Sequence, residues 1–567
     1  MKRKKYSILN PKDNTEYKKI SAVTMHDLGL DLICKELSKK ESERNYIMNI
    51  MSMIYADPYV TSYRCDVFDD IITNKKMRDE LMDILNKIDV LRDYRSFRHD
   101  YDENSGIWDL MHRLGEINDY IKCVDSLYEC LKDQNIHSAG FTGLREYVEG
   151  IYKDNGFGEL KDDISGLTLD TSKIKSITVG INLDDQFEAD GIGLLSVNSR
   201  YFTKAGVLSN FYDHLANKDK INDDATWNGD YKFHPFDGAL PVAQETLISS
   251  IPRTLSGITG VPDGDQTKDI TRYSDRVVNH MISQMVKRAR EVLNKYVSIT
   301  ITDMTDLIPE LMYYIRWAEY IEKLRANGSV FSKPTLHIDE KSEGGHYMEA
   351  RGVYNIKLAA FDTEESGSIV TNELDFDEDH RVYILTGANR GGKTTITQCI
   401  GQLFVLAQGG IYIPGDEFEF SPVDCIYTHF PADEDKTLDL GRLGEECKRF
   451  KEIFDDATGK SLMLLNETFS TTSFEEGYYI AKDSVRAILD KGIRTIFNTH
   501  MHKLAFDIHE MNDENADGKA YSLIIHSDGA KRSYKIELAP PAGKSYASDI
   551  AEKYGVTYDM LVNRTHG

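Results

Sequence analysis

A glycine-rich segment between a predicted strand and a predicted helix carries residues that can bind phosphate. The apolar run Arg381–Thr386 leads into Gly387-Ala388-Asn389-Arg390-Gly391-Gly392-Lys393-Thr394, a complete GxxxxGK[ST] pattern. Glycines let backbone N–H groups curl around phosphate oxygens, and the N-terminus of the following helix adds partial positive charge. Lys393 can reach the β- and γ-phosphates of ATP, and the Thr394 hydroxyl can ligate Mg²⁺. The candidate nucleotide-binding residues of this segment are Gly387, Asn389, Gly391, Gly392, Lys393, Thr394 and Thr395. The pattern alone is also compatible with a glycine-rich turn between a strand and a helix that binds no ligand.

Two further predicted strands end in residues that suit ATP hydrolysis. Ser461–Leu465 is followed by Asn466-Glu467, and Arg494–Asn498 is followed by Thr499-His500. A carboxylate at the end of a buried strand, on the same sheet edge as a phosphate loop, suits a general base for water. We therefore predict Glu467 as the catalytic base and His500 as a γ-phosphate sensor. Taken singly, the glutamate could be a solvated turn residue and the histidine a structural one.

The elements that must position these residues follow from the pattern of apolar side chains. From about residue 354 onward strands and helices alternate, which predicts a parallel sheet with helical crossovers. Residues 25–131 have helical spacing, whereas residues 177–183 and 194–197 have the pattern of short strands. Two long helices are expected near 278–296 and 304–318, each with one apolar seam; they are either packed levers or plain core helices. Pro309 is expected in the first turn of the second helix. The predicted domains are 1–165, a helical core; 166–268, a β-containing clamp-like or connector segment; 269–335, long lever helices; and 336–567, the ATPase domain.

Composition narrows the class of protein without fixing the target. The chain has 567 residues, a net charge of −25, 41% hydrophobic residues and seven cysteines. The cysteines form no CxxC pair, and no apolar run is long enough to span a bilayer, so we expect a cytoplasmic protein without a membrane partner. Such a chain is repelled on average by phosphate backbones, although a local basic channel is compatible with its composition.

Taken together, these segments resemble the MutS family of DNA mismatch-repair ATPases, which belong to the ABC-type ATPases. Residues 386–394 are similar to that family's TGPNMGGKST, residues 461–473 to SLVLMDEIGRGTS, and residues 495–500 to TLFATH. Asn372 stands where the family has its adenine-side Asn segment, and residues 542–547 resemble its closing G-x-SYG element. The resemblance covers about residue 354 to the end. It implies an α/β ABC-type P-loop ATPase domain at the C-terminus, preceded by a mainly helical core and lever region with a small β-containing insertion.

Three departures from the family qualify what the resemblance implies. Asn466 replaces the family's Asp, so Mg²⁺ is expected to bind weakly through Thr394 and Asn466. The signature loop near Leu440–Glu445 lacks the usual Ser. The chain opens in the helical core, so no mismatch-reading domain is expected, and Phe157-Gly158-Glu159 matches the F-x-E wedge by chance in a predicted loop.

The resemblance leaves three functions open. The first is a homodimeric clamp whose ATP hydrolysis is coupled to engagement of DNA by shape, without reading mismatches. Basic residues of the two predicted levers could then contact phosphates: Lys287, Arg288, Arg290, Lys295, Arg316, Lys323 and Arg325. The second is an ATP-dependent interaction protein that acts on a ribosome or a protein complex. The third is a nucleotide-binding scaffold that barely hydrolyses ATP, as Asn466 and the altered signature loop would allow.

Overall fold

The chain folds into two compact units. A computed structural model describes residues 6–12, 15–92, 107–166, 176–183, 189–198, 291–293, 295, 302–338, 346–360, 369–387, 391–431, 441–513, 518–528, 531–541 and 554–563. The first unit comprises residues 1–85, 130–147 and 306–567, and the second comprises residues 86–129 and 148–305. The first unit joins segments that are far apart in the sequence; the domain boundaries drawn from the sequence stay a prediction. No described helix is long and apolar enough to cross a membrane.

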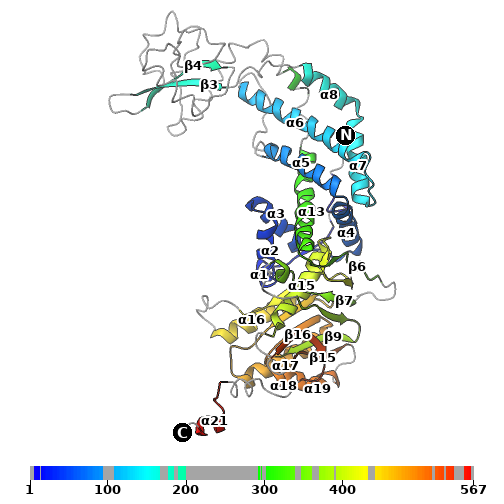
Figure 1. Cartoon of the computed structure of the whole chain (residues 1–567), viewed down its shortest axis with the longest axis vertical. Coiled ribbons are helices and arrows are strands. Elements are labelled where there is room, and N and C mark those ends of the chain that lie inside the picture. Colours follow the sequence, from blue (N-terminus) through cyan, green and yellow to red (C-terminus); the bar gives the residue numbers. More distant parts are fainter. Residues whose placement is uncertain are drawn as a thin grey trace, which may run out of the picture. The chain divides into compact units, whose positions relative to one another are not determined.

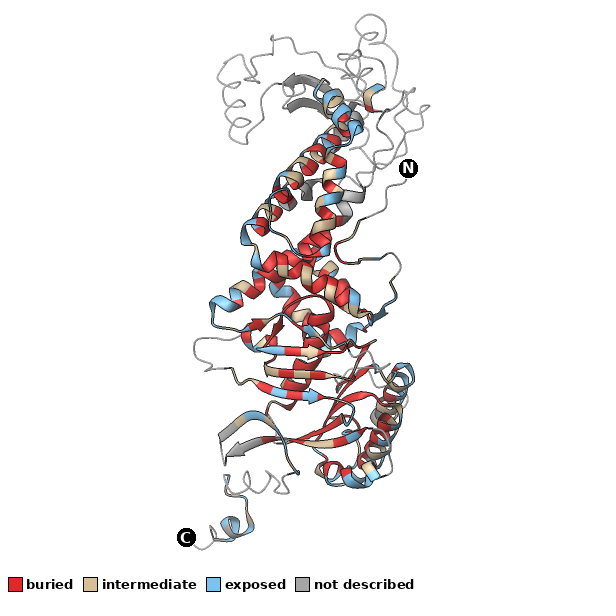
Figure 2. Ribbon diagram, turned by 90° about the vertical axis from the view of Figure 1, so that its right-hand side faces the viewer, coloured by how far each residue is buried: buried red, intermediate tan, exposed pale blue. Residues whose placement is uncertain are grey.

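A six-stranded sheet in the first unit has the strand order β12-β13-β14-β9-β15-β16; three of its strands, β9, β15 and β16, are labelled in Figure 1. Its strands are β12 (Ile426–His429), β13 (Leu462–Asn466), β14 (Arg494–Asn498), β9 (His380–Thr386), β15 (Lys519–Asp528) and β16 (Lys531–Leu538). Neighbours from β12 to β15 run parallel, and β16 is antiparallel to β15. Every residue of β13 and β14 is buried, as expected for parallel strands covered by helices on both faces. Figure 2 shows buried residues, in red, along strands and helices of the described chain. The predicted parallel sheet is confirmed.

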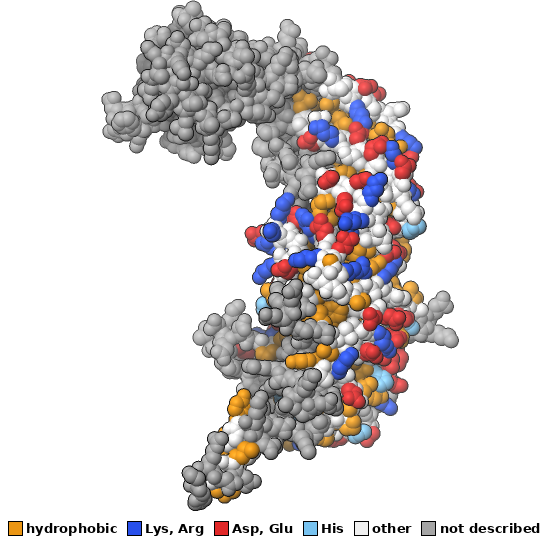
Figure 3. All heavy atoms as spheres, in the orientation of Figure 1, with side chains coloured by type: hydrophobic (Ala, Val, Ile, Leu, Met, Phe, Trp, Pro, Cys, Tyr) orange, Lys and Arg blue, Asp and Glu red, His pale blue; other side chains and the backbone are white. Residues whose placement is uncertain are grey.

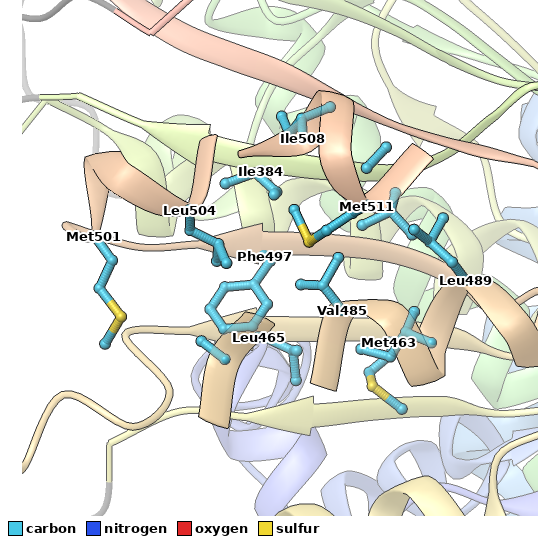
Figure 4. Close-up of a cluster of buried hydrophobic side chains, with 14 of the residues drawn as sticks. Ile384, Met463, Leu465, Val485, Leu489, Phe497, Met501, Leu504, Ile508 and Met511 are labelled. Atoms are coloured by element: carbon cyan, nitrogen blue, oxygen red, sulfur yellow. The ribbon is translucent and has the colours of Figure 1, made fainter. Parts of the chain in front are cut away.

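Helices α17 (Phe474–Lys491), α18 (His502–Phe506) and α19 (Ile508–Asp513) cover one face of this sheet. Figure 4 shows Val485, Leu489 and Leu504 from these helices against Met463, Leu465 and Phe497 from the strands. The intervening Leu464 points to the opposite face because side chains alternate along a strand. There it approaches Gly401 of α15 (Lys393–Gln408), the helix that follows the phosphate loop.

The helix α15 is tied to the N-terminal helices by buried glutamines. Gln402 is fully buried and donates to the carbonyl of Leu28 at 2.8 Å. Gln408, also fully buried, donates to the carbonyls of Tyr55 at 2.9 Å and Val423 at 2.8 Å. Just after the helix, Gly410 has φ of 82°, and a Cβ there would lie 2.4 Å from Cβ of Arg64. The C-terminal end of α15 therefore fits closely against the helical region and leaves no room for a side chain.

A second sheet and two paired short strands complete the α/β part of the first unit. The sheet has the order β6-β11-β7-β8, and β10 pairs with β5. The bounds are β5 (Phe331–Ser332), β6 (Thr335–Leu336), β7 (Met348–Val353), β8 (Asn372–Phe376), β10 (Ile413–Pro414) and β11 (Glu417–Phe420). β8 precedes β9 directly in the chain, so this sheet delivers Asn372 to the neighbourhood of the six-stranded sheet.

The helical part of the first unit includes β1 (Lys18–Lys19), α1 (Ala22–Asp27), α2 (Leu30–Leu37), α3 (Glu41–Ser52), β2 (Met53–Ile54), α4 (Pro58–Thr73), α5 (Lys75–Arg92), α13 (Thr302–Ala326) and α14 (Ile356–Ala360). Of α5, residues 75–85 belong to this unit, and of α13, residues 306–326. Side chains of α13 contact α3, α4 and α5. The prediction of a single apolar seam on the helix near 304–318 is wrong. Tyr313, Tyr314 and Trp317 are fully buried in addition to the expected Leu311 and Ile315, so α13 is a core helix here. It begins at Thr302, which places Pro309 inside the helix instead of in its first turn. The companion helix expected at 278–296 lies almost entirely outside the described residues.

The second unit contains helical and β segments, as the sequence predicts. α6 (Ile107–Leu131) and α7 (Ala139–Tyr152) each belong to it in part, and it holds α8 (Asn155–Gly166) and the antiparallel pair β3 (Ser176–Leu183) and β4 (Ala189–Asn198). The expectation of a loop at Phe157-Gly158-Glu159 is wrong, since these residues lie in α8. Phe157 is only 6% exposed and packs edge-on against Tyr120. A buried packing role explains this aromatic residue.

Glu43 of α3 forms a buried ion pair with α13. Its carboxylate is bonded to Arg316 Nε at 2.9 Å and to Ser38 Oγ at 2.7 Å. Burial raises the pKa of Glu43, but the hydrogen bonds from Arg316 and Ser38 and the charge of Arg316 outweigh it, so the pKa lies below its ordinary value. A lowered pKa means that this stabilisation is complete above the pKa of the unfolded chain. It is lost as the pH falls through the folded value.

We expect Glu43→Gln to lower the free energy of unfolding of this unit by about 1.5–3 kcal/mol at pH 7, since it weakens hydrogen bonds to a charged group. The difference from wild type should shrink below about pH 4. Glu319→Gln is the matched control, because Glu319 contacts the same Arg316 at 3.1 Å but is 46% exposed and is expected to cost less than about 1 kcal/mol. Urea titrations followed by circular dichroism at pH 7 and at acidic pH measure this. Equal effects of the two variants would contradict the buried pair.

Candidate functional site

The phosphate loop lies between β9, which ends at Thr386, and α15, which begins at Lys393. Gly392 caps the helix with φ of 96°, a left-handed conformation that strains residues with a side chain. The free N–H groups of the first turn of α15 then face the loop, where an anion is favoured. Residues 388–390 lie outside the described residues, so Asn389 stays a prediction.

Lys393 is buried at the start of α15. Its Nζ donates to the carbonyl of Gly387 at 3.0 Å, lies 3.4 Å from Nε2 of His500 and 4.0 Å from Oε1 of Glu467. Burial lowers the pKa of Lys393, and the charge of Glu467 partly offsets this. An ammonium group at the start of a helix that follows a glycine-rich loop is placed to form charge-assisted hydrogen bonds to the phosphates of a nucleotide.

Glu467 and His500 meet beyond the ends of β13 and β14. Oε1 of Glu467 lies 3.0 Å from Nε2 of His500. Glu467 has φ of 53°, an uncommon left-handed value for a residue with a side chain, and its N–H donates to the carbonyl of Asn498 at 2.9 Å. The bond to β14 therefore holds a tight turn that directs the carboxylate toward Lys393. Such strained positions concentrate at functional sites.

Thr394 and Asn466 supply oxygen atoms beside this carboxylate. The hydroxyl of Thr394 donates to Oδ1 of Asn466 at 3.0 Å, and the amide of Asn498 donates to the same oxygen. Hydroxyl and amide oxygens are ligands that suit Mg²⁺. The buried Oδ1 of Asn498 has no hydrogen-bond partner among the described residues. The donor atoms thus fit a magnesium ion, with a neutral amide at the end of β13.

The β15–β16 hairpin lies along the other side of the loop. Asn372 of β8 donates to the carbonyl of Tyr534 at 3.2 Å and accepts from the N–H of Ile536 at 2.8 Å. Tyr534 has φ of 57° and is 45% exposed, and a Cβ on Gly392 would lie 3.4 Å from its ring. Both ends of the Asn372 amide are thus used to hold the hairpin. Tyr534 was not predicted as a site residue. It lies in β16, far beyond the phosphate loop in the sequence, and only the pairing of β16 with β15 brings it beside Gly392.

A buried histidine that the sequence analysis also missed links the turn after Glu467 to α16 (Gly441–Asp456). Nδ1 of His429 lies 3.0 Å from Oγ1 of Thr468, and Nε2 lies 3.2 Å from the carbonyl of Glu446 in α16. Burial, and then the charge of Arg449, lowers the pKa of His429 to about 4, so the ring is neutral at physiological pH. Its position at the end of β12, one strand from β13, is the signal that could have found it.

The structure gives positions for two other predicted residues and for part of the signature loop. Thr395 lies in the first turn of α15, and its carbonyl accepts from Asn355 at 3.0 Å. Gly391 is buried beside Gly392. The signature loop is described only from Gly441, where α16 begins.

Three basic residues proposed as phosphate contacts have partners within the chain. Arg325 Nη2 donates to the carbonyl of Phe331 at 2.8 Å. Arg316 forms an ion pair with Glu43 at 2.9 Å, so a phosphate would have to compete with this carboxylate for it. Lys295, in the second unit, lies 2.8 Å from Asp163 and 3.5 Å from Glu159. Lys287, Arg288 and Arg290 lie outside the described residues.

Two family models match the chain. The model for MutS domain V matches residues 383–565, which include the phosphate loop, β13, β14 and the hairpin. The model for the MutS2 N-terminal domain matches residues 56–327. The two matches are successive along the chain and do not overlap, so they give independent support to one family.

Comparison with individual proteins points the same way. The chain is similar to endonuclease MutS2 of Thermus thermophilus (27% identical over 193 residues, 34% of this chain and 25% of that protein). It is also similar to DNA mismatch repair protein MutS of Methanococcoides burtonii (30% over 327 residues, 54% and 35%) and to MutS 2 of Halobacterium salinarum (32% over 189 residues, 32% and 22%). The matched segments thus span only between 22% and 35% of these relatives. By its MutS domain V, its MutS2 N-terminal domain and these relatives, the chain belongs to the MutS family.

Proposed function

We propose that the chain binds ATP at an ABC-type P-loop site and hydrolyses it slowly. The observation that carries this proposal is the meeting of Lys393, Glu467 and His500, within 3.0–4.0 Å of one another, at the ends of β9, β13 and β14. A cation, a carboxylate and an imidazole at the N-terminus of α15 suit phosphoryl transfer, which depends mainly on positioning and charge stabilisation.

Each residue has a role that its position supports. Lys393 exchanges its bond to Gly387 for the β- and γ-phosphates, and the first turn of α15 adds backbone donors. Glu467 takes a proton from the attacking water, and His500 contacts the γ-phosphate from the next strand. Mg²⁺, held by Thr394 and more weakly through Asn466, would neutralise phosphate charge. Asn372 and Tyr534 border the loop on the side that the family uses for adenine.

Slow turnover follows from the neutral amide at Asn466. A carboxylate there would add a negative charge close to Mg²⁺, and removing one preorganised electrostatic group near a transferring phosphoryl costs about 10²-fold or more in rate. The carboxylate of Glu467 also lies 3.0 Å from His500, so water must compete with this contact for the base. A scaffold that binds ATP without turnover is the limiting case of the same argument.

We expect Lys393→Ala to weaken binding of a fluorescent ATP analogue about 10- to 100-fold, since it removes charged hydrogen bonds worth about 1.5–3 kcal/mol. Lys482→Ala is the matched control. Lys482 of α17 lies outside the site and forms an ion pair with Glu510 of α19 at 2.6 Å, so its substitution should leave the affinity for the analogue unchanged. Equal affinity of Lys393→Ala and wild type would refute the site.

We expect Glu467→Gln to reduce ATP turnover by at least about 10²-fold while nucleotide binding persists, because the general base is lost. Asn466→Asp should raise turnover above wild type. Glu475→Gln, on the exposed start of α17, is the control and should change neither. Phosphate release under saturating ATP measures all three. Fast wild-type turnover that survives Glu467→Gln would exclude this mechanism.

We further propose that two copies form a two-fold symmetric cytoplasmic homodimer that engages DNA by shape under the control of ATP. The names of the relatives, an endonuclease and mismatch repair proteins, support a DNA target. The net charge of −25 and the mixture of acidic and basic side chains on the face in Figure 3 favour weak, local contacts over a broad basic surface. The alternative target is a ribosome or a protein complex, reached by the same ATP-dependent change.

Titration of labelled homoduplex, mismatch and four-way junction DNA at two salt concentrations, with and without ATP, tests the target. We expect weak, salt-sensitive binding that favours the junction, no preference for the mismatch, and loss of the ATP effect in Lys393→Ala. Light scattering on the same samples should detect the dimer with ATP. A clear mismatch preference, or a strict monomer throughout, would contradict the clamp. Absence of binding to every DNA would favour the alternative target.

A further inference from the structure

Two asparagines face each other at the ends of neighbouring strands beside the phosphate loop. Asn466 ends β13 and Asn498 ends β14, and the two are register partners. Asn466 is 6% exposed and Asn498 is fully buried. The amide nitrogen of Asn498 donates to Oδ1 of Asn466, which also accepts from the hydroxyl of Thr394 at 3.0 Å. One oxygen therefore collects donors from β14 and from the first turn of α15.

The two ends of an amide are chemically different, whereas the two oxygens of a carboxylate are alike. If the amide of Asn466 were turned over, its NH₂ group would face the hydroxyl of Thr394. That hydroxyl would then have to accept, and a lone pair otherwise available to Mg²⁺ would be used. A neutral amide can replace a carboxylate at this position only when its oxygen end is held toward Thr394.

Asn498 supplies the donor that can hold it. With its NH₂ group turned toward Asn466, the oxygen of Asn498 is left buried without a partner among the described residues, which is unfavourable. If both amides were reversed, an NH₂ group with two donors would occupy that buried place instead. The observed pairing leaves one acceptor unsatisfied and keeps the Thr394 hydroxyl as a donor.

We propose that Asn498 is a positioning residue that fixes the oxygen of Asn466 toward Thr394, so that the neutral amide accepts the hydrogen bond from the Thr394 hydroxyl. A carboxylate at this position would accept it with either of its two equivalent oxygens. The proposal rests on the proposed function, in that Thr394 and Asn466 face Mg²⁺ when ATP is bound. It requires Asn498 only while residue 466 is an amide. With Asp at position 466, either oxygen accepts from Thr394, and the donor from Asn498 becomes dispensable.

The test is the Mg²⁺ concentration that half-saturates binding of a fluorescent ATP analogue to the full chain. Wild type is compared with Asn498→Ala, Asn466→Asp and the double variant. We expect Asn498→Ala to raise this concentration about 3- to 10-fold, the range for one lost hydrogen bond, and to leave analogue binding in EDTA unchanged. In the Asn466→Asp background, Asn498→Ala should change the half-saturating Mg²⁺ concentration less than about twofold. The two oxygens of an aspartate at position 466 would be equivalent, so its orientation would no longer matter.

Asn512→Ala is the matched control, since Asn512 bonds the backbone of Ala520 at 2.9 and 2.8 Å away from the phosphate loop. It should leave the Mg²⁺ dependence at the wild-type value, whatever it does to the melting temperature. If Asn498→Ala does not fold, Asn498→Ser is used instead. Serine also lacks the amide, and its side chain is too short to reach the oxygen of Asn466, so the same results are expected.

The outcomes separate the orientation of Asn466 from the nucleotide site itself. Equal shifts in the amide and carboxylate backgrounds would indicate general loss of packing and overturn the role of Asn498. A wild-type Mg²⁺ dependence in both backgrounds would overturn it as well. Failure of the wild-type chain to bind the analogue at any Mg²⁺ concentration would instead overturn the proposed function, and the inference with it.

Discussion

The parallel register of β9, β13 and β14 brings together residues that are far apart in the sequence. Asn498 pairs with Leu385 on one side and with Asn466 on the other, so all three strands end at one edge. Glu467 and His500 follow the ends of β13 and β14 closely, and Lys393 begins the helix that the phosphate loop joins to β9. A shift of one residue in either pairing would turn the strand's side chains to the opposite face and separate these groups. The buried core on the other face of the sheet resists such a shift, since Met463, Leu465 and Phe497 would then lose their places.

The same edge is joined to the helical region through α15. Its first turn carries Lys393 and Thr394, and its buried glutamines bond to backbone groups of the N-terminal helices. At its end, Tyr313 of α13 donates to the carbonyl of Gly409 at 3.0 Å. Buried amides cost free energy when their partners leave, so a movement of α15 would carry these contacts with it. This continuity gives the proposed ATP-driven change a physical route from the phosphate loop to α13.

The strands and helix of the α/β part were predicted well from the sequence, because the apolar runs that form buried strands lie directly beside the residues that could bind nucleotide. The strands at 381–386, 461–465 and 494–498 and the helix after Lys393 were recognisable as apolar runs flanking a glycine-rich loop. The single seam expected near residues 304–318 was wrong, since three- and four-residue spacing says nothing of whether Tyr313, Tyr314 and Trp317 between those positions are also buried. Asn498, His429 and Tyr534 were missed because their roles depend on pairings between distant strands. The functions assigned to the predicted site residues still stand as predictions.

The turn after β13 shows how such distant contacts act on the candidate site. Glu467 and Phe469 both have positive φ, and a turn of this kind persists only when its surroundings hold it. The backbone of Asn498 holds its start at Glu467, and His429 lies 3.0 Å from Thr468 at its centre. Thr471 donates to the carboxylate of Glu446 at 3.1 Å, which ties its end to α16. The candidate base is therefore fixed from both β14 and α16, and a displacement of α16 would be transmitted to Glu467 through the histidine and threonine contacts. In the homodimer proposed above, the signature loop before α16 would face the partner subunit, so the base would respond to the partner without any residue of α16 contacting the nucleotide.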